Sequence, residues 1–78
     1  MNEALQVYGK PDCADYARTR ALLAELDVRF VFHDVTATQE AADTALSLAG
    51  TSRSPVLVFP SGAVLVEPDD EEIRRALL

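Results

Sequence analysis

The chain has 78 residues, 49% of them hydrophobic, and its thirteen Asp and Glu residues outnumber seven Lys and Arg residues, which gives a formal net charge of −6. This length allows one domain with one modest core, over residues 1–78. The negative charge opposes nonspecific binding to nucleic acid or anionic membranes. No apolar stretch is long enough to span a bilayer, and the N-terminus lacks the features of a signal peptide. A lone cysteine cannot form an internal disulfide and suits a reducing compartment, so we expect a cytoplasmic protein whose partners are small molecules or proteins.

The first third of the chain predicts a strand, a turn and a helix. Residues 4–8 are an apolar run too short for a helix, and Pro11 in the following turn prevents the strand from continuing. Apolar side chains then recur at three- and four-residue spacings over residues 14–26, which predicts an amphipathic helix. Its expected buried face consists of Ala14, Ala17, Ala21, Leu22 and Leu26.

The middle of the chain predicts a second strand and a second helix. Residues 28–35 are rich in Val and Phe, which favour strands. Thr38 can cap a helix over residues 38–49, and Gly50 stands where a left-handed C-cap is expected. The expected buried face of this helix consists of Ala42, Ala45, Leu46 and Ala49.

The last third predicts a hairpin and a final helix. Residues 55–59 form the nearly continuous apolar run typical of a strand covered on both faces. A turn at residues 60–62 is too short for a crossover, so the strand at residues 63–66 must be antiparallel to the one before it. Asp69 and Glu72 have the spacing of a capping box, and the helix after them would bury Ile73, Ala76 and Leu77.

These elements predict an α/β fold. In the order βαβαββα, two strands are each followed by a helix, which requires parallel crossover units. The closing hairpin adds two mutually antiparallel strands, which gives a four-stranded mixed sheet with helices on both faces. That three-layer arrangement is the order of a thioredoxin-type domain.

Cys13 lies between the first strand and the first helix. Free N–H groups and the helix dipole favour a thiolate there, as does Lys10, whereas Asp12 and Asp15 oppose it, so the residues leave the balance open. The alternative is a small buried hydrophobe without chemistry. Because acids flank it, the segment is expected to be exposed, and we favour a reactive thiol.

The segment Val-Tyr-Gly-Lys-Pro-Asp-Cys at residues 7–13 resembles the glutaredoxin family's strand end followed by Lys-Pro-x-Cys. Ser54-Pro55 is similar to the family's Thr-Val-Pro segment, whose proline is cis. Residues 59–68 most resemble the mycoredoxins, which act on mycothiol in place of glutathione. The resemblance implies a thioredoxin-like, glutaredoxin-type fold and thiol–disulfide exchange.

The active-site motif departs from the dithiol members of that family. They carry CxxC, whereas this chain reads Cys13-Ala14-Asp15-Tyr16, a CxxY motif without a resolving thiol. Activity would therefore be monothiolic. Monothiol members that hold an iron–sulfur cluster carry CGFS, which residues 14–16 do not match, and His33 has no Cys or His partner, so we expect neither cluster nor metal.

The resemblance also implies a binding site for a small thiol around Cys13. Ser54 would offer its backbone to the ligand, as in a short strand addition. Lys10 would bind a ligand carboxylate or be a surface lysine; Tyr16 would pack or close the cleft; and Asp69 and Asp70 would cap a helix or bind a ligand amine. The predicted thiol-ligand residues are Lys10, Tyr16, Arg53, Ser54, Pro55, Asp69 and Asp70.

The sequence thus predicts a monothiol oxidoreductase with Cys13 as its nucleophile. Its substrates would be mixed disulfides between proteins and a low-molecular-weight thiol, namely glutathione, mycothiol or bacillithiol, which serves as a co-substrate with no bound cofactor. We expect a monomer whose partners are that thiol and thiolated proteins. The rival hypothesis is a redox-inert binding module that has kept the fold and lost the resolving cysteine.

Overall fold

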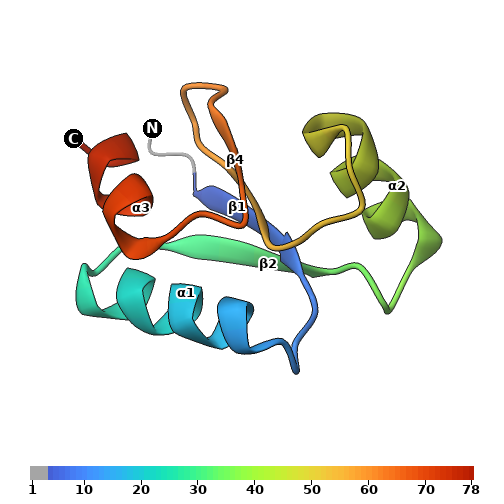
Figure 1. Cartoon of the computed structure of the whole chain (residues 1–78), viewed down its shortest axis with the longest axis horizontal. Coiled ribbons are helices and arrows are strands. Elements are labelled where there is room, and N and C mark those ends of the chain that lie inside the picture. The colour runs from blue at the N-terminus through green and yellow to red at the C-terminus, as the bar shows by residue number, and fades with distance from the viewer. Residues whose placement is uncertain (1–3) are drawn as a thin grey trace.

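Four strands form one mixed sheet in the computed structural model, which describes residues 4–78 (Figure 1). The sheet order is β2-β1-β3-β4, with β1 parallel to β2 and antiparallel to β3, and with β4 antiparallel to β3. This confirms the predicted element order and the closing hairpin. Only the first predicted crossover is parallel, because β3 pairs with β1 in the antiparallel direction. The elements are β1 (Leu5–Gly9), α1 (Ala14–Glu25), β2 (Phe30–Asp34), α2 (Gln39–Ala49), β3 (Val56–Val58), β4 (Val64–Val66) and α3 (Asp70–Ala76).

The main core lies between one face of the sheet and the pair α1 and α3. Alternate residues of a strand point to opposite faces, so Leu5 and Val7 of β1 face this core while Gln6 and Tyr8 face the other side. Phe30 and Phe32 of β2 are partly buried against the core. Its buried members are Leu5, Val7, Tyr16, Leu22, Leu23, Leu57, Phe59 and Ile73.

The predicted buried face of α1 is wrong, although the helix itself is confirmed. Ala14, Ala17 and Ala21 are exposed. Leu22 is the one member of the predicted face that is fully buried, and the helix otherwise buries Tyr16, Thr19 and Leu23. Burial of a Tyr and a Leu removes far more apolar area from water than burial of alanines, and exposed alanines still favour the helix through their high intrinsic propensity.

The other two helices bury less than their patterns predict. Only Ala45 of α2 is fully buried, and Leu46 of the expected apolar face is 51% exposed. In α3 Ile73 is fully buried, but Ala76 and Leu77 are exposed. The two helices lie near opposite ends of the molecule (Figure 1), and only α3, with seven residues, is short.

Local capping signals are confirmed. Thr38 caps α2 by accepting a hydrogen bond from the Ala41 N–H at 3.1 Å, and Gly50 ends that helix in the left-handed conformation at φ 71°. Asp69 and Glu72 form the predicted capping box at the start of α3. The second strand, predicted over residues 28–35, is shorter, because its first two residues lie before the pairing with β1 begins at Phe30. Within residues 4–78, no helix is long and apolar enough to cross a membrane.

Candidate thiol site

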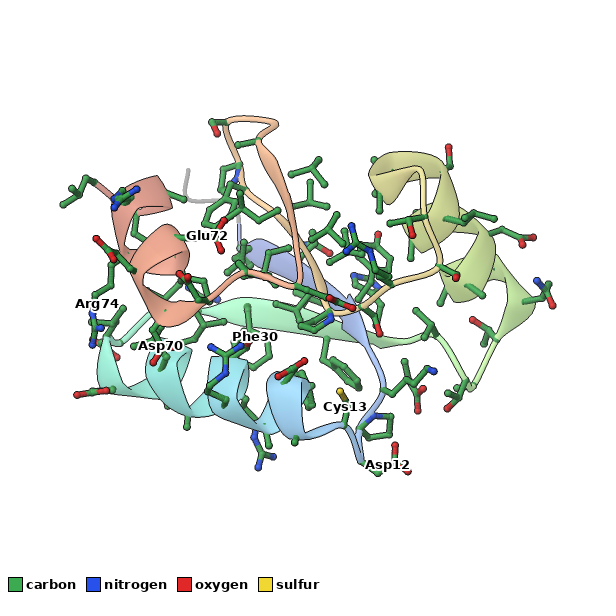
Figure 2. All side chains as sticks on the ribbon, viewed as in Figure 1. Asp12, Cys13, Phe30, Asp70, Glu72 and Arg74 are labelled. Atoms are coloured by element: carbon green, nitrogen blue, oxygen red, sulfur yellow. The ribbon has the colours of Figure 1, made fainter. Side chains whose placement is uncertain are left out.

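Cys13 is the N-cap residue of α1. Its backbone is extended, its N–H donates to the Lys10 carbonyl at 3.1 Å, and its own carbonyl accepts the Ala17 N–H at 3.0 Å, which begins the helix. The thiol makes no capping hydrogen bond and is partly exposed. Figure 2 shows its sulfur pointing toward the body of the protein, whereas Asp12 lies at the outer end of the loop. Cys13 therefore stands at a helix N-terminus with its sulfur free to react.

The Ser54-Pro55 segment lies beside the end of β1. The bond between these residues is cis, as the family resemblance implied. Gly9 precedes the Lys10–Cys13 turn, and a Cβ added to it would lie 3.5 Å from the Pro55 Cβ, an ordinary contact distance, so the two segments are direct neighbours. Within residues 4–78 the backbone N–H and carbonyl of Ser54 make no hydrogen bond, which leaves both available to a ligand.

A third segment, residues 67–70, joins β4 to α3 next to Pro55; we call it the wall segment. The Glu67 N–H donates to the Pro55 carbonyl at 2.8 Å, and Glu67 has a φ of 47°. Pro68 is fully buried. The sheet order places β3 between β1 and β4, and the bond from Glu67 to Pro55 joins the wall segment to the segment that carries Ser54.

The two predicted acidic ligand residues already have partners in the protein. One carboxylate oxygen of Asp69 accepts the Glu72 N–H at 2.8 Å in the capping box. Asp70 accepts a hydrogen bond from the Arg18 guanidinium at 2.6 Å, and Arg18 also donates to the Pro68 carbonyl at 3.1 Å. The sequence reasoning missed Arg18, because nothing in the local pattern of α1 distinguishes it from a solvated helix arginine.

The remaining predicted residues fall into two environments. Tyr16 is buried, with its ring stacked on Phe32 at a centroid distance of 4.3 Å and the Arg20 guanidinium 5.9 Å from its ring centre. The ring therefore belongs chiefly to the core beneath the thiol. Lys10 and Arg53 are exposed cations, and Arg53 lines a shallow groove between Ser54 and α2.

One carboxyl group, away from the thiol, has a perturbed pKa. Asp34 ends β2, and its Oδ1 accepts hydrogen bonds from the Thr36 hydroxyl at 2.6 Å and from the Thr36 N–H at 2.8 Å. These bonds favour the charged carboxylate and lower the pKa of Asp34 below its usual value of 3.8. The bond from the Thr36 hydroxyl has the largest effect on this pKa, and the bond from the Thr36 N–H comes second. Asp34 therefore fixes the turn that leads from β2 toward α2.

Solved structures share this fold. A glutaredoxin from Archaeoglobus fulgidus matches with a TM-score of 0.85 and 18% identity, covering 94% of this chain and 84% of its own. A variant of the thioredoxin-like protein BC3987 matches with a TM-score of 0.86 and 22% identity, and the match covers 97% of this chain and 96% of the BC3987 chain. A glutaredoxin from Brucella melitensis has 26% identity and a TM-score of 0.70, covering 95% and 79%. The predicted thioredoxin-like, glutaredoxin-type fold is thus confirmed.

The sequence itself matches the model of a protein family. No curated protein matches the chain. The family model described as glutaredoxin covers residues 5–64, a span that contains the Lys10–Cys13 turn and the Ser54-Pro55 bond and ends before the wall segment. Because the match covers well over half of the chain, the chain belongs to the glutaredoxin family.

Proposed function

We propose that this glutaredoxin-family protein is a monothiol thiol–disulfide oxidoreductase that acts through Cys13. The observation that carries the proposal is the position of the thiol, partly exposed at the N-cap of α1 and without a capping hydrogen bond, in a chain that has no second cysteine. The first-turn N–H groups and the helix dipole stabilise a thiolate at such a position. An unpartnered sulfur is also able to approach a disulfide.

The proposed cycle has two exchange steps. The Cys13 thiolate attacks the small-thiol sulfur of a mixed disulfide; the new bond joins Cys13 to the small thiol, and the client's sulfur leaves as a thiolate that takes a proton from water. A second molecule of the small thiol, as its thiolate, then attacks the carrier sulfur of that bond. This step releases Cys13 as its thiolate and forms the carrier's own disulfide. In the net reaction one external thiol is consumed, and one disulfide, that of the carrier, replaces the mixed disulfide of the client.

The carrier thiol would lie between three parts of the site. Its backbone-like portion would pair with the free N–H and carbonyl of Ser54 beside Pro55. Lys10 and Arg53 would bind an anionic group on one side, and Asp69 would face the other. Tyr16 would support the thiol loop from below, with little ring surface left for the ligand.

The carrier we favour is mycothiol, with glutathione and bacillithiol as the alternatives. The support is that residues 59–68 resemble the mycoredoxins. These residues include β4 and the first part of the wall segment. The clients would be proteins carrying the same thiol, and the protein would act as a monomer in the cytoplasm. Exchange rates with matched mixed disulfides of the three carriers would rank them, and equal rates for all three would contradict a preference for mycothiol.

One observation favours the rival, a redox-inert binding module. Asp69 and Asp70 are already bonded to Glu72 and Arg18, so the acidic side of the cleft is less available to a ligand than the sequence predicts. The rival predicts that Cys13 alkylates at neutral pH no faster than free cysteine. Our proposal predicts that Cys13 alkylates faster than free cysteine at neutral pH.

Substitution of the thiol tests the proposal directly. Cys13→Ser should abolish exchange with a mixed disulfide and lower the free energy of unfolding by no more than about 1 kcal/mol, because the side chain packs against the core but is only partly buried. Ser47→Ala, exposed on α2, is a matched control that should retain full activity. Turnover by Cys13→Ser would refute the mechanism.

Substrate type tests the monothiol step. When Cys13 attacks an internal protein disulfide, the client becomes bonded to Cys13 and keeps its own second thiol nearby. That second thiol then attacks the new bond and restores the original disulfide. We therefore expect appreciable rates on thiolated proteins and low rates on insulin-type disulfides, measured at the same concentration of free thiol. Equal rates would contradict the monothiol scheme, and no rate on either substrate would favour the inert module.

A further inference from the structure

We infer that Arg18 is a positioning residue of the thiol site, which holds the wall segment against α1 and withdraws Asp70 from contact with the carrier thiol. The inference rests on the proposed function, because it concerns how the same site selects its small thiol. It gives Arg18 a role that its sequence context does not reveal.

Three contacts join the Arg18 guanidinium to its surroundings. Nη1 donates to Asp70 Oδ1 at 2.6 Å, Nη2 donates to the Pro68 carbonyl at 3.1 Å, and Nη2 lies 3.8 Å from Asp15 Oδ1. The first two cross from α1 to the wall segment. A planar guanidinium that bonds a carboxylate and a backbone carbonyl together fixes direction as well as distance, which a lysine cannot do.

The wall segment is held at its other end by Pro55, the residue before β3. The Glu67 N–H bonds the Pro55 carbonyl at 2.8 Å, and Pro68 between the two attachments is fully buried. The segment therefore connects the element that carries Ser54 with the helix that carries Cys13. With a rise of 1.5 Å per residue, Arg18 lies about 7.5 Å along α1 from Cys13, so its guanidinium acts on the site through the wall segment.

The ion pair between Arg18 and Asp70 also affects the charge that the wall segment presents to a ligand. With Arg18 in place, the Asp70 carboxylate is neutralised and turned toward α1. Without Arg18, that carboxylate would add an uncompensated negative charge beside Glu67 and Asp69. A carrier thiol with a carboxylate would then bind less well, and one with an amine would lose less affinity or gain some.

The experiment compares Arg18→Met with Arg75→Met in single-turnover exchange. Arg75 pairs with Glu71 within α3 at 2.6 Å, so its removal changes the net charge equally without touching α1. The substrates are mixed disulfides of one aromatic thiol with glutathione, which is anionic, and with cysteamine, which is cationic. Both the saturating exchange rate and the half-saturating concentration are measured.

For Arg18→Met we expect the half-saturating concentration of the glutathione substrate to rise about five- to tenfold, with the saturating rate unchanged, and that of the cysteamine substrate to rise less. Arg75→Met should change either value by less than about twofold. Arg18→Lys should lie between wild type and Arg18→Met, because an ammonium replaces the charge but not both hydrogen bonds.

Asp70→Asn supplies a test of sign that does not require Arg18→Met to fold. It removes one negative charge from the wall segment and leaves Arg18 with Asp15 as its acidic neighbour, so it should shift preference toward glutathione, opposite to Arg18→Met. With an active wild type, three outcomes would overturn the inference. The first is an equal shift in Arg75→Met, and the second is an unchanged preference in both Arg18→Met and Asp70→Asn. The third is an Arg18→Met variant in which only the saturating rate falls. A wild type inactive on these two substrates and also on the mycothiol and bacillithiol mixed disulfides would instead overturn the proposed function, and the inference with it. Activity on the mycothiol substrate alone would overturn the inference, because that carrier has neither a carboxylate nor an amine for the wall segment to select.

Discussion

The two faces of the sheet are packed very differently. On the face toward α1 and α3, side chains from two helices and two strands form a core in which Leu23, Leu57 and Ile73 are fully buried. On the opposite face α2 buries little beyond Ala45, and Val31 of β2 is 44% exposed. Stability therefore comes mainly from one face, and the thiol loop is attached to the helix of that face.

Polar contacts replace packing on the weaker face. The Tyr8 ring stacks on His33 with a centroid distance of 4.3 Å, and the His33 Nε2 is hydrogen-bonded to the Gln6 Oε1. A cavity of about 330 Å³ separates this pair from the first turns of α2. Such a face tolerates change, whereas the core face should respond to each lost methyl group.

The largest expected effect is the loss of a large side chain from the core face. Leu23→Ala should lower the free energy of unfolding by about 2–5 kcal/mol, because it leaves a cavity at a fully buried position. Leu46→Ala on α2, at a position 51% exposed, should cost less than about 1 kcal/mol. Urea unfolding of the two variants measures the contrast, and equal losses would mean that both faces carry the stability.

A substitution at the C-cap of α2 should destabilise that helix through backbone strain alone. Gly50→Ala should cost about 1–2 kcal/mol, because the C-cap is left-handed at φ 71° and an alanine Cβ is strained there. That Cβ would have no atom within 4 Å, so the cost is conformational only. Hydrogen exchange should show faster opening of α2 than of α1. Equal acceleration in both helices would show that the two faces unfold together.

The core face also contains one polar group without a partner. Among the described residues, the Thr19 hydroxyl is fully buried and makes no hydrogen bond. Thr19→Val keeps the shape and removes that hydroxyl, so we expect a gain of about 1 kcal/mol in the free energy of unfolding. Thr44→Val on α2, which is partly exposed, is the control and should change it little. A clear loss in Thr19→Val would mean that the hydroxyl is solvated or bonded in solution.

The smallest effect concerns the turn after β2. The Thr36 bonds lower the pKa of the Asp34 carboxyl in the folded state, so their stabilisation is present above the unfolded pKa and is lost as pH falls through the folded value. Thr36→Val should therefore be slightly less stable than wild type near pH 6, and the two should converge below about pH 3. Chemical denaturation across that range measures the difference. A difference that grows toward low pH would contradict the assignment.

Local patterns in the chain predicted its elements and part of its site. A threonine cap, a C-terminal glycine and a capping box act between residues a few positions apart, so Thr38, Gly50 and the pair Asp69 and Glu72 could be read directly. Cys13 was placed between strand and helix by the same local reasoning. These interactions need no partner from elsewhere in the fold.

The burial of each face and the neighbours of the thiol depended on the tertiary structure. Spacing alone could not decide between the alanine face of α1 and the face that carries Tyr16 and Leu23, because both have helical periodicity and only the sheet's position selects between them. The contact of Arg18 with Asp70 joins positions 52 residues apart. Such a pair forms only because the sheet brings the wall segment beside α1, which no local pattern in either segment encodes.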